Sequence, residues 1–468
     1  MPRLSPVVDN NRSFLNRKGI LLTNIELKHG DCLEVLKTLP DNSVDSVVTD
    51  PPYGISFMNK KWDYNIPSIE VWKEVLRVLK PGGHLLSACG TRTQHRMVCN
   101  IEDAGFEIRD VITWLYGSGF PKSYNIAKGI ESLVRTGSAN GKDWKELGGK
   151  EYEQKTGYVK MQYEQGARPD YSDRISRDID ITTPEAKEWL GWGTALKPSC
   201  EFWTLARKPI SEKSVPANVL KWGTGGINID ATRIEFFSDK DKSNLEKSKR
   251  TVRTGVIGLC NGESGFMSSN ADGEVLEGTD YINQLGRFPA NLILDEESAL
   301  LLDEQGGNSR SSKQIRRNSE NHKESFTCGK FNDIDGKGYG DSGGVSRFFY
   351  IAKASKAERN AGVEDLPKQT IEGQLSFLDE GGYSNNTGAP NKPISNQNFH
   401  PTIKPITLMR YLIKLVTPDG GTVLDPFMGS GSTGCACVLE GIDFIGIEID
   451  SAYLEISKKR IDYWKKKK

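Results

Sequence analysis

The sequence lacks the features that define several protein classes. No stretch approaches the roughly 18 consecutive apolar residues of a membrane-spanning helix, and the first residues hold no apolar signal core. The eight cysteines form no CxxC pair, which argues against a zinc ribbon or a disulfide framework. The five histidines show no metal-ligand spacing. We therefore expect a soluble, cytoplasmic protein with reduced thiols and no metal.

The chain also lacks an excess charge of either sign. Lys+Arg and Asp+Glu both number 62, so no global positive field indicates a nucleic-acid partner, and local clusters would have to provide one. The basic stretch Lys240–Arg253 could follow a DNA backbone, although a solvated charged segment is the commoner explanation of such a stretch. At 468 residues with 48 glycines, the chain predicts more than one unit and long loops.

Ordinary α/β patterning is confined to the two ends of the chain. In the first segment, strands are expected at Ile25–Gly30, Ser43–Thr49, His84–Ala88 and Ile108–Tyr116, and helices at Cys32–Leu39, Ile69–Leu79 and Thr91–Ala104. Pro81-Gly82-Gly83 is expected to separate the second helix from the next strand. Strands that alternate with helices predict a parallel, doubly wound sheet.

The second α/β segment begins near Thr407. It predicts a helix at Leu408–Leu415, a strand at Thr422–Asp425, a helix ending at Gly441, a strand at Phe444–Ile449 and a helix from Ala452 into a frayed basic tail, Lys465–Lys468. Between the segments, Glu201–Arg207 reads as a core strand, Phe348–Ala352 as a short strand and 306–344 as a loop. We therefore divide the chain into residues 20–120, 121–395 (with 190–210 returning to the core sheet) and 396–468.

The tetrapeptide Asp50-Pro51-Pro52-Tyr53 directly follows an apolar strand. Ligands bind at the carboxyl ends of the strands in such sheets, and the prolines leave backbone carbonyls as acceptors. A carboxylate and a carbonyl can accept both N–H groups of an exocyclic base amine and make its nitrogen more nucleophilic. Tyr53 offers a stacking face for a flipped base. The alternative is a plain strand-ending turn with a packed tyrosine.

A glycine loop, Asp425–Gly434, follows the expected strand Thr422–Asp425 and opens a helix. Its glycines allow close approach of a ligand to the backbone, and Ser432 or Thr433 can cap the helix. Glu448 ends the next strand, where a carboxylate can accept from both hydroxyls of a ribose. The loop has no Gly-Lys-Ser/Thr, so it is not a Walker-type phosphate loop. General nucleotide binding, or a simple strand-end acid, would explain either feature alone.

Together, the two motifs resemble those of the N4-cytosine/N6-adenine DNA methyltransferase family, which pairs a DPPY-type catalytic motif with an FxGxG cofactor loop. The catalytic motif comes first here, an order that resembles the β subclass, with target recognition between the motifs. The resemblance covers residues 25–120 and 395–465. It implies an α/β fold with a Rossmann-like doubly wound methyltransferase sheet, a large irregular target-recognition insertion, S-adenosylmethionine as cofactor and double-stranded DNA as substrate.

The resemblance also assigns roles to individual residues. Asp50, Pro51, Pro52 and Tyr53 would be catalytic. Phe427, Gly429 and Gly431 would line the methionine and ribose side of the cofactor, and Glu448 would hold the ribose. Asp31 of Gly30-Asp31 would lie near the adenine. Lys404 belongs to His400-Pro401-Thr402-Ile403-Lys404-Pro405, which resembles an HPTxKP element at the methionine end. Asp425 and Thr433 belong to the cofactor loop and are assigned to the same site.

These assignments predict a site-specific DNA methyltransferase that modifies adenine N6, since the motif begins with Asp. Cytosine N4 is the alternative, followed by methylation of RNA or protein and by an inactive DNA-binding module. A cytosine-C5 enzyme needs a cysteine that usually follows proline, and no cysteine does so here. Cys435 and Cys437 are expected to pack. A homodimer and a separate restriction endonuclease are further expected partners, in a bacterial cell or a phage-infected host.

Overall fold

The computed structural model describes residues 23–56, 61–117, 123–139, 150–153, 175–178, 180–235, 286–310, 342–352, 356–367, 369–370 and 395–468. The chain forms two compact units, one of Met1–Ile227 with Lys353–Lys468 and one of Asn228–Ala352. The predicted insertion, 121–395, therefore contributes to both units. The basic stretch Lys240–Arg253 and most of 306–344 lie outside the described residues. Within the described ranges, no helix is long and apolar enough to cross a membrane.

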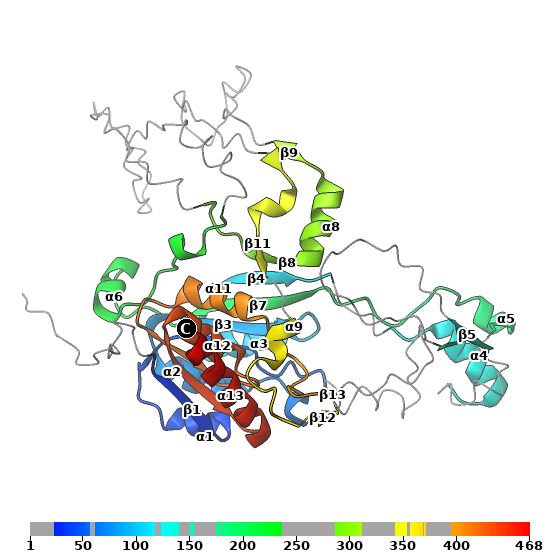
Figure 1. The fold of residues 1–468 in the computed structure, drawn as a ribbon, viewed down its shortest axis with the longest axis horizontal. Helices are drawn as coiled ribbons and strands as arrows, with labels where there is room; N and C mark the ends of the chain where they lie inside the picture. The colour runs from blue at the N-terminus through cyan, green and yellow to red at the C-terminus, as the bar shows by residue number, and fades with distance from the viewer. Residues whose placement is uncertain are drawn as a thin grey trace, which may run out of the picture. The chain divides into compact units, whose positions relative to one another are not determined.

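The larger unit contains a mixed sheet in the order β1-β15-β14-β2-β3-β7-β4 (Figure 1). Its strands are β1 (Ile25–His29), β15 (Asp443–Glu448), β14 (Thr422–Asp425), β2 (Val44–Thr49), β3 (Leu79–Gly90), β7 (Cys200–Arg207) and β4 (Glu107–Leu115). Neighbours from β1 to β3 are parallel, whereas β7 is antiparallel to both β3 and β4. The expected doubly wound sheet is confirmed, with one reversed strand that the sequence pattern does not show.

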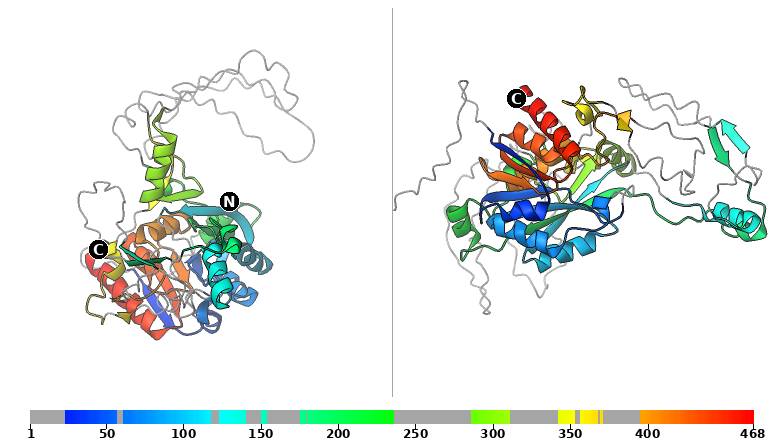
Figure 2. Two further views of the ribbon diagram at one scale, coloured as in Figure 1. Left: turned by 90° about the vertical axis from the view of Figure 1, so that its right-hand side faces the viewer. Right: turned by 90° about the horizontal axis from the view of Figure 1, so that it is seen from below.

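Helices cover both faces of this sheet. One face carries α1 (Cys32–Lys37), α2 (Ile69–Val78) and α3 (Gln94–Asp103), and the other carries α11 (Ile406–Val416), α12 (Ser432–Glu440) and α13 (Ser451–Lys467) (Figure 2). The core under the first face includes Leu36, Trp72 and Met97, all fully buried. Helix α13 continues to Lys467, so the basic tail that was expected to fray is helical instead.

The two distant halves of the chain meet at β2 and β14. Val423 pairs with Ser46, and Leu424 pairs with Val47. The buried Ser46 and Thr417 hydroxyls lie 2.7 Å apart, and the Asp45 carboxylate accepts from the Thr422 backbone N–H at 2.9 Å. This register brings the ends of β2 and β14, which both precede an Asp-Pro motif, to the same edge of the sheet.

Strand β3 begins earlier than expected. Pro81-Gly82-Gly83 was expected to separate helix α2 from a strand starting at His84, but the segment lies inside β3. Strand β3 starts at Leu79, which pairs with Val44, and then His84 pairs with Ser46. The extra residues form an irregularity inside the strand rather than a break. The Pro81 carbonyl accepts from the Asn218 amide at 2.8 Å and from the Thr224 hydroxyl at 2.6 Å, which satisfies the displaced backbone.

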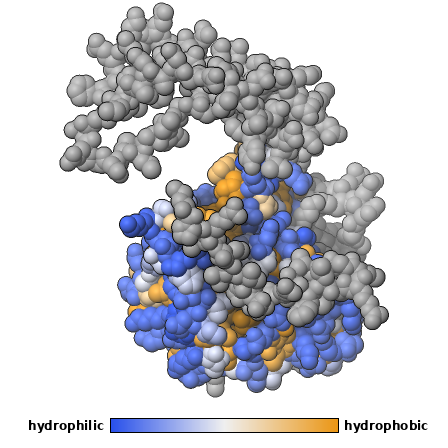
Figure 3. All heavy atoms as spheres, turned by 90° about the vertical axis from the view of Figure 1, so that its left-hand side faces the viewer, coloured by the Kyte–Doolittle hydropathy of each residue, from blue (hydrophilic) through white to orange (hydrophobic). Residues whose placement is uncertain are grey.

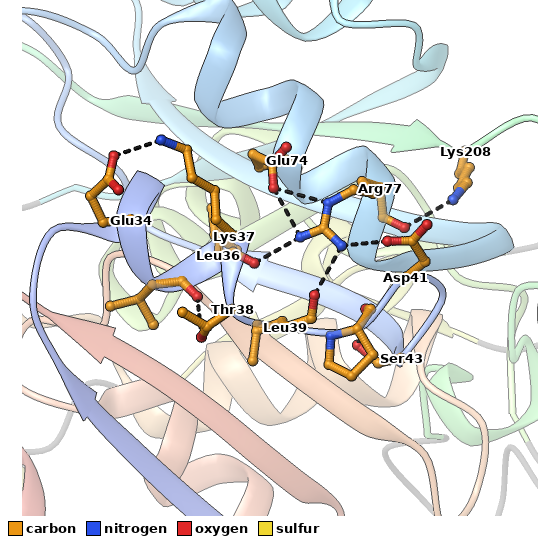
Figure 4. A network of polar contacts seen from close by, with 12 residues as sticks. Glu34, Leu36, Lys37, Thr38, Leu39, Asp41, Ser43, Glu74, Arg77 and Lys208 are labelled. Carbon is orange, nitrogen blue, oxygen red and sulfur yellow. Dashed lines mark hydrogen bonds and ion pairs between the residues drawn. The ribbon is translucent and has the colours of Figure 1, made fainter.

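The opposite edge, where the parallel strands begin, is held by Arg77 at the end of α2 (Figure 4). Its guanidinium donates to the Leu36 and Leu39 carbonyls at 2.8 and 2.9 Å and pairs with Asp41 and Glu74. Lys208, just after β7, donates to the Leu79 carbonyl at 2.7 Å. Backbone carbonyls at loop and helix ends are thereby satisfied by two long cationic side chains, which leaves the other edge for the site.

The remaining described elements surround this sheet or belong to the second unit. In the larger unit they are α4 (Ile126–Thr136), β5 (Lys150–Glu153), β6 (Ile175–Asp178), α5 (Pro184–Lys187), α6 (Val215–Trp222), α9 (Lys356–Asn360), β12 (Gln369–Thr370), β13 (Ser395–Asn396) and the 3-10 turn η2 (Lys61–Asp63). In the second unit they are η3 (Asp230–Thr232), β8 (Leu292–Asp295), α8 (Glu296–Gly306), β9 (Ser309–Arg310), β10 (Ser342–Gly343), η4 (Val345–Phe348) and β11 (Tyr350–Ala352). The strand expected at Phe348–Ala352 is shorter because η4 takes its first residue.

On the face drawn in Figure 3, described residues are mainly hydrophilic with smaller hydrophobic groups between them.

Candidate active site

The loop after β2 is fixed by polar contacts to its backbone. The Asp63 carboxylate, at the end of η2, accepts from the backbone N–H groups of Tyr53 at 2.6 Å and Gly54 at 3.1 Å. The Thr93 hydroxyl donates to the Tyr53 carbonyl at 2.6 Å. A Cβ at Gly90, the last residue of β3, would lie 3.2 Å from the Tyr53 ring, so glycine there allows the ring to pack closely. These contacts fix the backbone of Tyr53 and Gly54 and the position of the Tyr53 ring at the carboxyl end of β2.

A lysine lies between two carboxylates at this loop. The Lys404 ammonium is 2.8 Å from Asp50 Oδ2 and 3.1 Å from Glu201 Oε2. It also donates to the Tyr53 hydroxyl at 3.2 Å, while that hydroxyl lies 2.8 Å from Asp50 Oδ1 and donates to it. The Lys404 side chain is 7% exposed, and those of Asp50 and Glu201 are each 19% exposed. The four side chains form one connected cluster with a single positive charge and two negative charges.

The cluster favours a charged lysine and a neutral tyrosine. Burial alone would lower the pKa of Lys404, but the charges of Asp50 and Glu201 outweigh it and raise that pKa above its ordinary value. Burial, reinforced by the same two carboxylates, raises the pKa of Tyr53 well above its usual range. Lys404 is therefore an ammonium and Tyr53 a neutral phenol at physiological pH.

Glu201 is a site residue that the motifs do not identify. It lies near the start of β7, where it pairs in register with Gly90 of β3 and Trp114 of β4. Since β7 runs antiparallel, its first residues reach the edge at which the parallel strands end. A glutamate at the start of an expected core strand was the only available signal, and its relevance depends on a strand direction that the residues alone do not specify.

Lys404, which the resemblance assigns to the methionine end of the cofactor, contacts the catalytic loop. Its Nζ lies among Asp50, Tyr53 and Glu201. The methionine end of the cofactor carries the methyl group and would have to face this loop, so the assignment of Lys404 to that end stays a prediction. The segment reaches both loops, because His400 at its start packs against Gly429 of the glycine loop. We accordingly group Lys404 with the catalytic motif.

Asp425, at the start of the glycine loop, is hydrogen-bonded to neighbouring residues of the protein through both oxygens of its carboxylate. Its Oδ1 accepts from the Thr49 hydroxyl at 2.6 Å and from the Phe427 backbone N–H at 3.1 Å, and its Oδ2 accepts from the Thr433 hydroxyl at 2.6 Å. The residue is 2% exposed, and burial raises its pKa to about 6. Asp425 and Thr433 therefore shape the loop from beneath and tie it to the end of β2.

Two buried side chains from outside the glycine loop, Arg460 and His400, contact its backbone. Arg460 of α13 is fully buried and donates to the Ser430 carbonyl at 2.6 Å. Gly429 has a left-handed φ of +54°, and a Cβ there would lie 2.8 Å from His400 Nε2. His400 Nδ1 lies 3.0 Å from the Thr402 carbonyl and must be its donor. Burial lowers the pKa of His400 to about 4, so the packed ring is neutral.

Two acids lie at the ends of neighbouring parallel strands. Glu448 ends β15 and pairs in register with His29 of β1, two residues before Asp31. Glu448 accepts from the Gly429 backbone N–H at 2.7 Å, and burial raises its pKa. Asp31 caps α1 by accepting from the Leu33 backbone N–H at 2.9 Å. Each carboxylate keeps further lone pairs that could accept from a ligand.

The groups that surround the glycine loop suit a nucleoside-containing cofactor better than a metal. It combines the carboxylates of Asp31 and Glu448, glycine backbone and the half-buried Phe427 ring, which lies edge-on to Trp72 at 6.4 Å. Hydroxyls, an amino group and an apolar chain would each find a complementary surface here. Among the residues that the structure describes, no group of three or more His, Cys, Asp or Glu side chains could hold a metal ion.

Comparison with known proteins places this geometry in context. Residues 44–459 match the N6/N4 methyltransferase family described as DNA methylase. The type II methyltransferase M2.DpnII of Streptococcus pneumoniae is 44% identical over 63 residues, which cover 14% of this chain and 24% of that protein. DNA adenine methyltransferase YhdJ of Escherichia coli (strain K12) is also 44% identical over 63 residues, or 14% of this chain and 21% of that protein. The matched segment thus spans less than a quarter of either relative.

Solved structures align over more of the chain but with low scores. The complex of M1.HpyAVI with SAM aligns over 94% of this chain and 99% of that one, at 15% identity and a TM-score of 0.34. The cytosine-N4-specific PvuII DNA methyltransferase covers 94% and 86%, at 12% identity and a TM-score of 0.38.

Proposed function

Because the chain belongs to the N6/N4 family of DNA methylases, we propose that it transfers a methyl group from S-adenosylmethionine to adenine N6 in double-stranded DNA. One observation carries the proposal: the Asp50–Tyr53 loop and the Asp425–Gly434 loop follow neighbouring parallel strands, β2 and β14. Thr49 and Asp425 are hydrogen-bonded at 2.6 Å across this junction. The proposed amine acceptor and the proposed cofactor loop would thereby lie side by side.

The cofactor would supply an electrophilic methyl group on a sulfonium. We assign the ribose hydroxyls to Glu448, which ends β15, and the adenine amino group to Asp31 beyond the neighbouring strand β1. The backbone of Gly429 and Gly431 and the ring of Phe427 would border the remaining chain. Asp425 and Thr433 would act indirectly, since their side chains are hydrogen-bonded to each other.

At the catalytic loop, the Asp50 carboxylate and the Pro51 carbonyl would accept the two N–H groups of the target amine. These acceptors orient the nitrogen lone pair and stabilise the positive charge that develops on nitrogen during transfer. The Tyr53 ring, held by Gly90 and by its hydroxyl contact with Asp50, would stack on the flipped base. The methylated amine can release its proton to solvent, so no general base with a shifted pKa is required.

The named relatives support the choice of base and of biological setting. YhdJ is named a DNA adenine methyltransferase, and the first residue of the motif, Asp50, agrees with adenine. M2.DpnII is named a type II methyltransferase, which supports a separate restriction endonuclease as functional partner. Target recognition is assigned to residues 121–395, the segment between the two motifs.

The test uses purified protein, DNA and S-adenosylmethionine labelled in its methyl group. Asp50→Ala should lose about 10²–10³-fold in transfer rate, because one preorganised acceptor is removed. Calorimetric titration should show that it still binds S-adenosylmethionine, since Asp50 lies outside the glycine loop. Near-native transfer by this variant would refute the catalytic assignment. A wild-type protein that binds no S-adenosylmethionine would refute the enzymatic function altogether.

A further inference from the structure

We propose that Lys404 occupies, in the base-free protein, the Asp50 oxygen that the target amine takes, and that Glu201 retains Lys404 when the base enters. Glu201 is then a positioning residue whose charge permits this exchange. The inference rests on the proposed amine methylation and deepens it, since it assigns a role at the same loop to two residues outside the catalytic tetrapeptide.

Both oxygens of Asp50 are engaged in the structure. Oδ1 accepts from the Tyr53 hydroxyl at 2.8 Å, and Oδ2 accepts from the Lys404 ammonium at 2.8 Å. A target amine that approaches Oδ2 would compete with the ammonium for the lone pairs of this oxygen. Its N–H group is a donor of the same kind as the ammonium N–H, so the lysine nitrogen stands where an amine nitrogen would bind. Tyr53 is held by its backbone contacts to Asp63, whereas Lys404 has a long and rotatable side chain, so Lys404 is the group that yields.

A displaced ammonium needs another partner at once. Lys404 is 7% exposed, and a buried charge without a counter-ion is strongly disfavoured. Glu201 already contacts the ammonium at 3.1 Å, and the Tyr53 hydroxyl contacts it at 3.2 Å. When the ammonium leaves Asp50, these two contacts can persist. The exchange therefore requires a rearrangement within an existing cluster rather than transfer of the lysine to solvent.

Glu201 also sets the sign of the charge around the reacting nitrogen. The charges of Asp50, Lys404 and Glu201 give a net charge of minus one, which favours the positive charge that develops on the amine during transfer. Without Glu201 the same cluster would be neutral, and Lys404 would have Asp50 as its single carboxylate partner there. The lysine would then compete more strongly with the amine. A purely structural ion pair between β7 and the 400–405 segment makes neither prediction.

The experiment compares binding of two duplexes that contain the mapped recognition site. One carries the target adenine and the other carries purine, which lacks the amino group, and both are measured with S-adenosylhomocysteine present so that no transfer occurs. The wild-type preference, which is the ratio of its affinities for the adenine and purine duplexes, is the reference value, since purine also pairs more weakly with thymine and is easier to flip. Glu201→Gln should reduce that preference at least about threefold, because Lys404 then binds Asp50 more strongly and competes with the amine. Lys404→Met should increase the preference, because the competing ammonium is removed.

Glu107→Gln is the matched control, because Glu107 pairs at 2.6 Å with Arg207 at the far end of the same strand, β7. It should leave the preference unchanged. In single-turnover transfer, Glu201→Gln should be about tenfold slower than wild type with unchanged S-adenosylmethionine affinity, and Glu201→Asp should recover part of the rate. If Lys404→Met does not fold, the Glu201 variants and the control decide the question.

Equal losses of affinity for both duplexes in Glu201→Gln, or a shift of preference in the same direction in Glu201→Gln and Lys404→Met, would overturn the exchange and leave a structural ion pair. Failure of the proposed function has a different signature, since the wild-type protein would then transfer no methyl group to either duplex.

Discussion

The two Asp-Pro loops of this protein occupy equivalent places and use their aspartates in opposite ways. Asp50-Pro51 follows β2, and Asp425-Pro426 follows the neighbouring strand β14. The partners of Asp50 are the ends of two side chains, the Tyr53 hydroxyl and the Lys404 ammonium. The partners of Asp425 are the hydroxyls of Thr49 and Thr433 and the backbone N–H of Phe427.

The difference shows that the dipeptide does not determine the role of the acid. Asp425 is 2% exposed and its hydrogen bonds shape a loop, whereas the Asp50 side chain is 19% exposed and its partner Lys404 is the group that we propose to be exchanged for substrate. A carboxylate that receives a substrate must have a partner that can leave. A carboxylate that positions a backbone needs partners that stay in place.

The largest expected effect concerns the pH dependence of stability at Asp425. Its folded-state pKa is raised from 3.8 to about 6, so the folded protein keeps a proton that the unfolded chain loses in this window. Stability therefore falls as pH rises from about 4 to about 6, by about 3 kcal/mol at 1.36 kcal/mol per unit. Asp425→Asn cannot ionise. Urea unfolding at pH 4 and pH 7 should show its stability rising relative to wild type by about this amount, and a constant difference would contradict the account.

The next effect tests whether the glycine loop is held by the framework. Arg460→Met removes the donor to the Ser430 carbonyl, and we expect a loss of about 2 kcal/mol in the free energy of unfolding and weaker binding of S-adenosylmethionine. Arg410→Met is the control, because Arg410 is 40% exposed in its pair with Glu440 and should contribute less than about 1 kcal/mol. Equal effects of the two substitutions would show that the buried arginine does not support the loop.

The smallest effect separates backbone strain from crowding in the same loop. Gly429 and Gly420 have left-handed φ values of +54° and +70°, but a Cβ at Gly429 would lie 2.8 Å from His400 Nε2, whereas nothing lies within 4 Å of one at Gly420. Gly420→Ala should cost about 1 kcal/mol from strain alone. Gly429→Ala should cost more and also reduce S-adenosylmethionine affinity about tenfold. His400→Ala should restore part of that affinity in the double variant, and no recovery would exclude crowding as the cause.

Much of the sheet could be predicted because its elements are marked locally. Apolar β-branched runs predict β2 and β14, and the Asp-Pro motifs that follow them predict the loops. The β3 boundary failed for the opposite reason, since the Pro81 carbonyl is satisfied by Asn218 and Thr224, which are distant in sequence. A proline-glycine break predicts a strand end only where no such partners exist.

The site was predictable only in part. Asp50 and Tyr53 follow β2, and Glu448 is the last residue of β15, and both strand ends are visible in the sequence. Glu201 depends on the reversed direction of β7, and that direction is set by pairing with β3 and β4 rather than by local residues. The burial of Arg460 likewise depends on how α13 packs against the glycine loop.

The most direct test of the central claim is nucleoside analysis of DNA from cells that express the wild-type protein or Asp50→Ala. The account predicts N6-methyladenine at a defined sequence with the wild type and a loss of at least about a hundredfold with the variant. N4-methylcytosine in its place would contradict the assignment to adenine. Equal modification by both proteins, or none by either, would contradict the assignment of Asp50 as the acceptor in a DNA methyltransferase.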